Sequence, residues 1–325
     1  MGTFTVVGGT ELDELASAFG LGAVTSSRTI AAGTINSNFE LVTESGRYFL
    51  RINEGKAEVD VAWESRVVAA LAEAGVVTPP PLVAKDGRPY APLAGAGATK
   101  WVSAFPWREG MHLAAAAITQ EHAATFGGTL AELHRAGMEL PAAWRRGSIY
   151  DYDHLVTRFQ RFARVHDPEL GDAKRILGEE LMIAGDARLI RRRATHGIIH
   201  GDLFRDNVLW QADRITAILD FEQASGGSLV YDLAVCINDW CWTGEPRIDL
   251  ARALIAGYER VRTLTDSDRE ALPYEIRAAA ARFTITRITD VYLARLTNPE
   301  KDFRAFLARC EAWRGPSLGQ LTATL

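Results

Sequence analysis

Short apolar runs, each bounded by polar or turn-forming residues, mark the centre of the chain. The runs at 198–199, 208–210 and 215–219 are of this kind, and their lengths predict three strands with a turn before the third. Polar side chains stand where these strands end: His200-Gly201-Asp202 follows the first run and Asp220 the third. The pattern therefore predicts strand, loop, strand, turn, strand, with carboxylates at strand ends.

Alternation of apolar and polar positions predicts a small β-rich lobe in residues 1–105. The runs 36–43 and 47–53 alternate in this way and are joined by Glu44-Ser45-Gly46, which is a hairpin signal. A third strand-like run covers 99–105. Helices are expected beside these strands at 11–19 and 58–74, each followed by a glycine.

From residue 106 onward, the apolar positions recur with the period of helices. We expect Thr119 to cap the first of these helices and Gly137 to follow its end. The expected fold class is α+β, with a small β-rich lobe at 1–105 and a larger helical lobe at 106–325. Helices are predicted at 119–135, 152–165, 173–193, 231–242, 248–261, 266–271, 275–294 and 302–313.

One carboxylate falls on the apolar face of the helix predicted at 58–74. Glu64 shares that face with apolar residues, and an inward carboxylate needs a cation. Arg51 on the neighbouring strand is the expected partner, and Lys56, in a turn, is a second and less fixed candidate. In kinases, a strand cation paired with a helix glutamate is oriented onto ATP phosphates. The alternative is a solvated Glu64 at the edge of the face.

Backbone groups for a nucleotide are predicted at two places. The small polar run 32–38 ends in Ser37 and Asn38, and its N–H groups would lie over phosphates; an ordinary turn into a strand is the alternative. A hinge is expected at 103–107, where Ser103 and Phe105 would present backbone groups to adenine.

The polar motif at the centre of the chain consists of Asp202, Asn207 and Asp220, at spacings of five and thirteen residues. Phosphoryl transfer uses such a set, with one Asp to accept the proton of the substrate hydroxyl and an Asn with a second Asp to hold Mg²⁺. Asp232, near the start of the next helix, is predicted to accept hydrogen bonds from the loop backbone or His200; a helix cap is the alternative.

Composition narrows the classes of function. The chain has 325 residues, 47% of them hydrophobic and 24% charged, as in soluble globular proteins. A net charge of −5 argues against nucleic acid as a partner. Three cysteines without zinc spacing favour a reducing cytoplasm. We expect no secretory signal, no membrane span and no membrane partner; the oligomeric state is open.

The motif His-Gly-Asp-x4-Asn with a downstream Asp-Phe-Glu resembles the aminoglycoside-phosphotransferase/choline-kinase superfamily over nearly the whole chain. Within it the chain looks most like bacterial homoserine kinases of this fold, by the runs 35–39, 202–208 and 231–241. The resemblance implies a two-lobed protein-kinase-like fold that uses ATP and Mg²⁺. The lobe at 1–105 would bind the nucleotide, and the helical lobe at 106–325 would carry the catalytic residues and bind the acceptor. The resemblance also implies that Asp202 is the catalytic base, that Asn207 and Asp220 hold Mg²⁺, and that Arg51 contacts phosphate.

A homoserine kinase acts in threonine biosynthesis on an amino-acid alcohol. Such an acceptor needs a cation for its carboxylate and an acid for its ammonium group. The candidates for these contacts and for the pocket wall are Arg205, Glu222, Asn238, Asp239, Trp240, Arg287 and Asp290.

Other functions stay open. The same chemistry serves other acceptors, such as an aminoglycoside, choline or another small alcohol. An inactive nucleotide-binding regulatory module is a second alternative, although all three motif residues are intact. A protein kinase is disfavoured because no long activation segment separates Asp220 from Tyr231.

Overall fold

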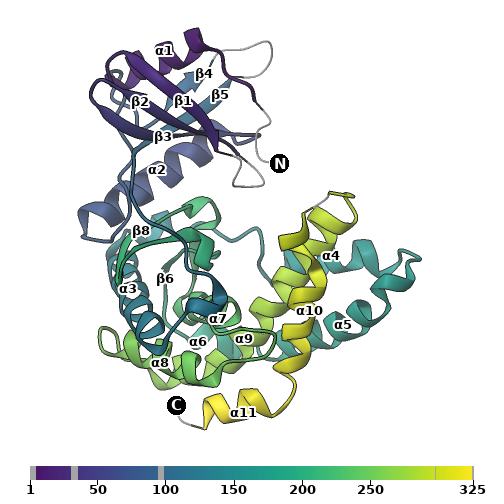
Figure 1. Cartoon of the computed structure of the whole chain (residues 1–325). Helices are drawn as coiled ribbons and strands as arrows, with labels where there is room; N and C mark the ends of the chain where they lie inside the picture. The colour runs from purple at the N-terminus through teal and green to yellow at the C-terminus, as the bar shows by residue number, and fades with distance from the viewer. Residues whose placement is uncertain (1–4, 31–35, 94–98, 297, 324–325) are drawn as a thin grey trace. The chain divides into compact units, whose positions relative to one another are not determined.

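The computed structural model describes residues 5–30, 36–93, 99–296 and 298–323 (Figure 1). A small antiparallel sheet and many helices make the chain α+β, which confirms the predicted class. The chain divides into two compact units. The first holds 1–111 with 209–211 and 215–222, and the second holds the remaining residues. The first unit therefore extends beyond the predicted boundary at residue 105 to residue 111, and it also includes two short segments from the centre of the chain. The functional division into a nucleotide lobe and an acceptor lobe stays a proposal.

The first unit is built on a five-stranded antiparallel sheet with strand order β1-β2-β3-β5-β4. The predicted hairpin is present, with Phe39 opposite Leu50. The edge strand β1 was missed because five of its seven positions are exposed, so no apolar alternation marks it. The strands are β1 Val24–Ile30, β2 Ser37–Thr43, β3 Gly46–Asn53, β4 Ala91–Leu93 and β5 Lys100–Pro106.

Two helices accompany this sheet, α1 Gly9–Phe19 and α2 Glu58–Glu73. The first ends at Gly20, whose φ of 68° is the left-handed conformation of a helix cap. Leu12 and Phe19 bury the apolar face of α1 in a core shared with strand residues such as Leu41 and Leu50. Both helices were predicted, and α1 begins two residues earlier than expected because its capping starts at Gly8.

The second unit is mostly helical, and its closest helix contact joins α3 and α8. A Cβ on Gly127 would lie 2.0 Å from the carbonyl oxygen of Leu254, and one on Gly257 would lie 2.0 Å from that of Ala124. Only glycine permits this approach. The α-helices are α3 Gln120–Glu139, α4 Tyr152–Ala163, α5 Gly171–Asp186, α6 Arg188–Arg193, α7 Leu229–Trp240, α8 Ile248–Glu259, α9 Asp266–Arg287, α10 Phe303–Ala312 and α11 Pro316–Thr322.

Short helical turns connect these elements. A π-helix, η6 Ile288–Tyr292, extends α9. The 3₁₀ turns are η1 Ala115–Ala117, η2 Ala142–Trp144, η3 Pro168–Leu170, η4 Arg205–Asn207, η5 Phe221–Gln223 and η7 Pro299–Lys301. No helix within the described ranges is long and apolar enough to cross a membrane.

Several predicted helix boundaries were wrong. The helix predicted at 173–193 forms two helices, α5 and α6, which are separated at Ala187. Gly137 lies inside α3 rather than after it. A Cβ there would lie 2.8 Å from the carbonyl oxygen of Ile198, so this glycine serves close packing of α3 on β6 rather than the end of the helix. The predicted helices 266–271 and 275–294 form one helix, α9, that continues through Pro273 and ends at Arg287. The final helix α11 was not predicted.

The central strands are present as predicted. β6 His196–Ile199 precedes the loop, and β7 Val208–Gln211 and β8 Arg214–Ile218 pair with each other. β6 pairs with β9 Ser225–Ser228, which was missed because its sequence is Ser-Gly-Gly-Ser. A Cβ on Gly227 would lie 2.4 Å from Cδ1 of Ile199, so glycine lets β9 lie against the Ile199 side chain of β6.

Candidate active site

Arg51 and Glu64 form a buried ion pair between β3 and α2 in the first unit. Their exposed fractions are 6% and 4%, and Nη2 of Arg51 donates to Oε1 of Glu64. Burial opposes ionisation of Glu64, but the positive charges of Arg51 and Lys56 outweigh it and lower its pKa to about 2. Helical periodicity placed Glu64 inward, and the strand supplies the cation that such a carboxylate needs.

Lys56 has two ion-pair partners, although its place in a turn predicted a less fixed side chain. Its Nζ lies 3.0 Å from Oε2 of Glu64 and 3.3 Å from Oε2 of Glu222. Glu222 also accepts a hydrogen bond of 2.8 Å from Nδ2 of Asn36. Glu222, predicted to contact the acceptor, is thus bound within the first unit, where it balances the charge of Lys56.

Asp220 follows β8 in a strained backbone conformation, with φ at 62°. Non-glycine residues in this region are uncommon and concentrate at functional sites. Nη1 of Arg51 lies 3.1 Å from its Oδ1, and its side chain is 41% exposed. Partial desolvation and the negative charge of Glu222 raise the pKa of Asp220 above its ordinary value, against the opposing effect of Arg51. The structure therefore presents one carboxylate oxygen to Arg51 and keeps the group accessible.

The residues predicted to contact the nucleotide lie in strands β2 and β5. The hydroxyl of Ser37 donates to Oε1 of Glu54 at 2.7 Å, and Asn38 pairs with Arg51 in the β2–β3 register. Residues 32–35 of the predicted phosphate loop, 32–38, lie outside the described residues.

The predicted hinge coincides with the end of a strand. Ser103 is buried and accepts a hydrogen bond from Nδ2 of Asn53 at 3.1 Å. The guanidinium of Arg51 lies 5.8 Å from the ring centroid of Phe105. Because β5 continues to Pro106, four of the five residues predicted as a hinge are paired in the sheet.

In the second unit, Asp232 anchors the loop that follows β6. Its carboxylate accepts the backbone N–H groups of His200 at 2.6 Å and of Gly201 at 2.7 Å. It also lies 3.2 Å from Nε2 of His134, whose Nδ1 is 2.8 Å from the hydroxyl of Tyr258. Burial opposes ionisation of Asp232, yet the hydrogen bond from His134 lowers its pKa. A buried, ionised carboxylate thus fixes the loop backbone.

Gly201 is required by the shape of this loop. Its φ is 80°, and a Cβ would lie 2.8 Å from the carbonyl oxygen of Gln223. Both the backbone conformation and the space therefore exclude an ordinary side chain.

Asp202 and Asn207 lie together at the start and end of the loop. Nδ2 of Asn207 donates to the carbonyl oxygen of Asp202 at 2.8 Å, which leaves Oδ1 of Asn207 free to accept. The side chain of Asp202 is 31% exposed, and Nη1 of Arg282 lies 3.5 Å from its Oδ1. Sequence reasoning missed Arg282 as a site residue, although an arginine between Ala281 and Phe283 is a charge in a locally apolar stretch.

Two residues predicted to form the acceptor wall are core residues. Asn238 is fully buried; its Nδ2 donates to the carbonyl oxygens of Ala234 and Ile276, each at 2.9 Å, and its Oδ1 accepts from Trp313. Trp240 is also fully buried, and its ring stacks on Phe126 with centroids 4.0 Å apart. Their polar groups are used inside the unit, so their assignment to a pocket wall was wrong.

The remaining acceptor candidates have partners of their own. Asp239 accepts from the backbone N–H and from Nε of Arg205, both at 2.9 Å. Asp290 pairs with Arg158 at 2.5 Å. Arg287, at the end of α9, is half-buried, and burial lowers its pKa to about 10. Arg205 and Asp239 therefore neutralise each other.

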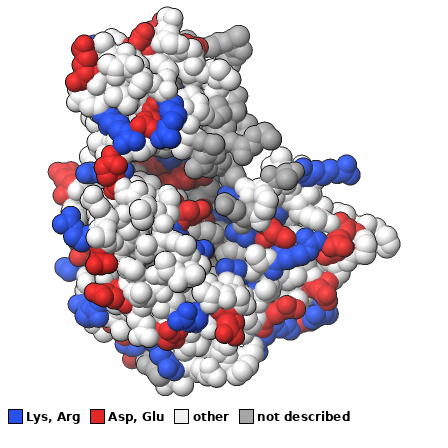
Figure 2. Space-filling model, viewed as in Figure 1, with Lys and Arg blue, Asp and Glu red and all other residues white. Residues whose placement is uncertain are grey.

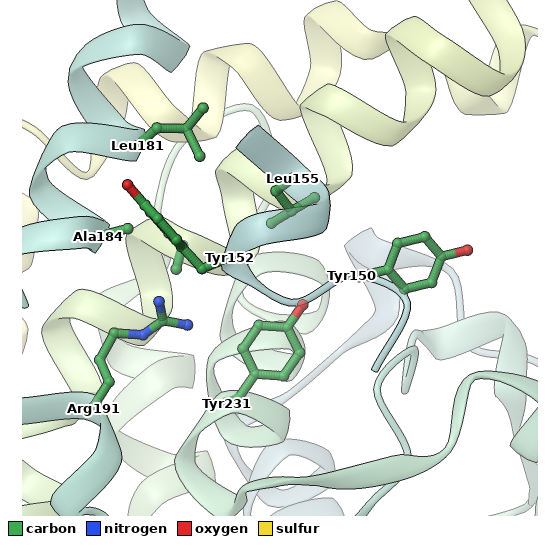
Figure 3. A pocket seen from close by; sticks show the side chains of 8 residues that line it. Tyr150, Tyr152, Leu155, Leu181, Ala184, Arg191 and Tyr231 are labelled. Atoms are coloured by element: carbon green, nitrogen blue, oxygen red, sulfur yellow. The ribbon is translucent and has the colours of Figure 1, made fainter. Parts of the chain in front are cut away.

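Figure 3 shows a cavity of the second unit, which has a volume of about 20 Å³. That space is large enough for one water molecule and too small for a nucleotide or an amino acid. Arg191, which points into it, is bonded to Glu275 at 2.8 Å. The lining residues are Tyr150, Tyr152, Leu155, Leu181, Ala184, Arg191, Tyr231 and Ala278. This cavity is not an acceptor pocket as it stands.

Further features of the chain concern metal binding, cysteines and surface charge. Within the part of the chain that the structure describes, no group of three or more His, Cys, Asp and Glu residues is arranged to hold a metal ion. Cys236, Cys241 and Cys310 are all buried and free. On the face seen in Figure 2, acidic and basic residues are interspersed, and this face carries no broad basic field of the kind that binds nucleic acid.

Comparison with known proteins places the chain in a family. The sequence profile of the phosphotransferase enzyme family (APH) matches residues 26–264. A homoserine kinase of Bradyrhizobium sp. (strain ORS 278) is 34% identical over 89% of this chain and 88% of its own length. A homoserine kinase of Gluconacetobacter diazotrophicus is 35% identical over 89% of each chain.

A solved structure is similar over the whole chain. It is an aminoglycoside phosphotransferase from Alicyclobacillus acidocaldarius, which is 16% identical, has a TM-score of 0.69, and is matched over 100% of this chain and 98% of its own. This likeness confirms the predicted protein-kinase-like fold. The profile match and the relatives above 30% identity together show that the chain belongs to the phosphotransferase enzyme family, and it is therefore a kinase-type transferase, as its motifs predicted.

Proposed function

We propose that the protein is an ATP-dependent kinase that transfers the γ-phosphoryl group of ATP to the hydroxyl of L-homoserine, a step of threonine biosynthesis. The observation that carries the proposal is the loop of Asp202 and Asn207, which is fixed by Asp232 and bears a partly exposed carboxylate. Identity above 30% to curated homoserine kinases along most of the chain supports the choice of acceptor. We also propose a cytoplasmic location for the protein.

Asp202 is the proposed catalytic base. Two buried hydrogen bonds from His200 and Gly201 to Asp232 hold the backbone that carries it. A carboxylate fixed in this way orients the acceptor hydroxyl and takes its proton late in the transfer. Because its side chain is 31% exposed, an acceptor can reach it without unfolding the loop.

Arg51 and Lys56 are the proposed contacts to ATP phosphates. Glu64 holds both cations, as a helix glutamate holds the strand lysine in kinases. Nε of Arg51 is buried and finds no hydrogen-bond partner among the residues described, so the guanidinium keeps a donor for a phosphate oxygen. Ser37, Asn38, Ser103 and Phe105 remain proposed neighbours of the nucleotide.

Asn207 and Asp220 are the proposed ligands of Mg²⁺. Asn207 retains Oδ1 as an acceptor, because its Nδ2 is occupied by Asp202, and the Asp220 side chain is 41% exposed. Oxygen ligands of this kind suit Mg²⁺, which binds one or two protein groups and completes its shell with phosphates and water. When bound, the ion neutralises charge on the phosphates during transfer.

The alternatives concern the acceptor or the absence of activity. An aminoglycoside or choline kinase has the same nucleotide machinery, and an inactive module keeps binding without turnover. The test is ATP consumption by the full chain with homoserine, threonine, serine, choline, ethanolamine and kanamycin in parallel. Turnover with homoserine alone is the expected result. Turnover with kanamycin or choline but not homoserine would replace the proposed acceptor, and turnover with none would favour the inactive module.

A further inference from the structure

Arg282 is a buried cation next to the proposed catalytic carboxylate. It lies in α9, is 4% exposed, and reaches Oδ1 of Asp202 with Nη1 at 3.5 Å. Its guanidinium carbon lies 3.8 Å from the ring centroid of Phe283 and 4.1 Å from that of Tyr150. These rings stabilise a positive charge. They contact its π-face, whereas the N–H donors of a guanidinium lie in its plane.

The hydrogen bonds of Arg282 are incomplete. The contact to Asp202 is at the outer limit of hydrogen-bond distance, and its buried Nε has no partner within the described ranges. By contrast, Arg277 on the same helix makes two bonds of 2.8 Å to Glu180, and Arg191 makes bonds of 2.8 and 3.0 Å to Glu275. A buried N–H donor without a partner costs free energy. The guanidinium of Arg282 can therefore accept one more anion as a hydrogen-bond partner.

The neighbourhood of Arg282 carries further positive charge. The hydrogen bonds that the structure gives Arg287 and Arg309 go to backbone carbonyl oxygens rather than carboxylates. Both guanidinium groups lie 4.4 Å from the ring centroid of Phe306. Burial lowers the pKa of each to about 10. The carboxylates of Asp239, Asp202 and Asp206 act on Arg287 through space, but the structure gives neither Arg287 nor Arg309 a hydrogen bond to a carboxylate. Their positive charges favour a negatively charged ligand nearby.

We propose that Arg282 binds the carboxylate of the acceptor amino-acid alcohol while Asp202 receives its hydroxyl. The planar fork of arginine matches a carboxylate with two parallel hydrogen bonds. Two other cations were predicted for this role. Arg205 is paired with Asp239, and Arg287 donates to the carbonyl oxygen of Asp302. This assignment rests on the proposed function, and it makes Arg282 the residue that distinguishes amino-acid alcohols from plain amino alcohols.

Tyr150 limits access to this guanidinium. It lies in the non-helical segment that precedes α4, and it also lines the small cavity of Figure 3. Its ring centroid lies 4.1 Å from the guanidinium carbon of Arg282, so a carboxylate has to approach the guanidinium along its edge, where the N–H donors lie.

The test compares L-homoserine with 3-aminopropan-1-ol, which has the same hydroxyl and ammonium groups but no carboxylate. Arg282→Met removes the donors and keeps the length of the side chain. We expect it to lower kcat/KM for homoserine by about 10- to 100-fold, mainly through KM, and to leave the value for 3-aminopropan-1-ol within a few fold. Arg269→Met, on the same helix and paired with Glu259 at the surface, is the control and should change neither value.

The outcomes separate three accounts. Equal losses of kcat on both acceptors would mean that Arg282 only positions Asp202, and this would overturn the inference while leaving the proposed function intact. No effect on either acceptor would also overturn it. Absence of homoserine turnover by the unsubstituted protein would overturn the proposed function itself. If Arg282→Met fails to fold, Arg282→Lys keeps the charge but loses the fork, and it should still raise KM for homoserine alone.

Discussion

The carboxylate of Asp232 accepts the backbone N–H of Gly201 at 2.7 Å, although the two residues are 31 positions apart in the chain. The same carboxylate accepts the N–H of His200 at 2.6 Å. Helix α7 thereby holds the loop that carries Asp202, and none of the three groups is exposed to water as an alternative partner. The position of the proposed base thus depends on a residue that does not touch substrate.

Asp232→Asn should therefore affect both stability and turnover. The amide offers one acceptor oxygen in place of two and leaves a buried N–H of the loop unpaired, which costs about 1–3 kcal/mol. Urea unfolding followed by circular dichroism measures this loss. Turnover should fall at temperatures where the variant is fully folded. Asp172→Asn, at an 81% exposed position, is the matched control, and equal stability of the two variants would contradict the anchoring role.

Glu64 should make stability depend on pH in the acid range. Its pKa is about 2 in the folded protein and about 4.3 in an unfolded chain. A lowered folded pKa means that the unfolded state binds the proton more readily, so the contribution is fully present above about pH 4.3 and is lost as the pH falls towards 2. Glu64→Gln should flatten the fall in unfolding free energy between pH 5 and 2.

The same substitution should destabilise the protein at neutral pH. Removing one partner of a buried ion pair costs about 3–5 kcal/mol, and here it leaves Arg51 and Lys56 without their shared carboxylate. Glu73→Gln, at an exposed position of the same helix, should change neither the neutral stability nor the acid slope. An unchanged acid slope in Glu64→Gln would show that the ion pair does not contribute to stability.

Asp220→Asn should lose Mg²⁺-dependent turnover without losing the fold. The side chain is 41% exposed, so the substitution leaves little buried surface unpaired, while it removes the charge that favours a divalent cation. Initial rates over a titration of MgCl₂ measure the effect. Asp213→Asn, 85% exposed in the β7–β8 turn, should behave like the unsubstituted protein. Normal rates for Asp220→Asn at low Mg²⁺ would remove it from the metal site.

Local patterns were sufficient to predict most of the fold. The β2–β3 hairpin follows from alternation and from Gly46, and α2 follows from its periodic face. The errors lie where tertiary contacts decide. Gly137 reads as a helix end but serves the contact with Ile198, and β9 is Ser-Gly-Gly-Ser because β6 packs closely on it. Such requirements come from residues distant in the chain, so no local pattern carries them.

For the candidate site too, local patterns predicted some contacts but not those between residues distant in the chain. The Arg51–Glu64 pair was predictable because a carboxylate on an apolar helix face requires a cation. The partners of Asn238 were not predictable: a polar residue in an apolar helix suggested a pocket wall, whereas its amide bonds to Ile276 and Trp313 in the core. Arg282 was missed because its relation to Asp202 spans 80 positions of the chain.

The most direct test of the central claim is product formation by the unsubstituted protein and by Asp202→Asn, measured side by side. Both are incubated with ATP, Mg²⁺ and L-homoserine, and phosphohomoserine is quantified by ³¹P NMR. The account predicts phosphohomoserine with the unsubstituted protein and a kcat lower by about 10²–10⁴ in the variant, with an unchanged thermal unfolding temperature. Equal rates for the two proteins, or no phosphohomoserine from a folded unsubstituted protein, would contradict it.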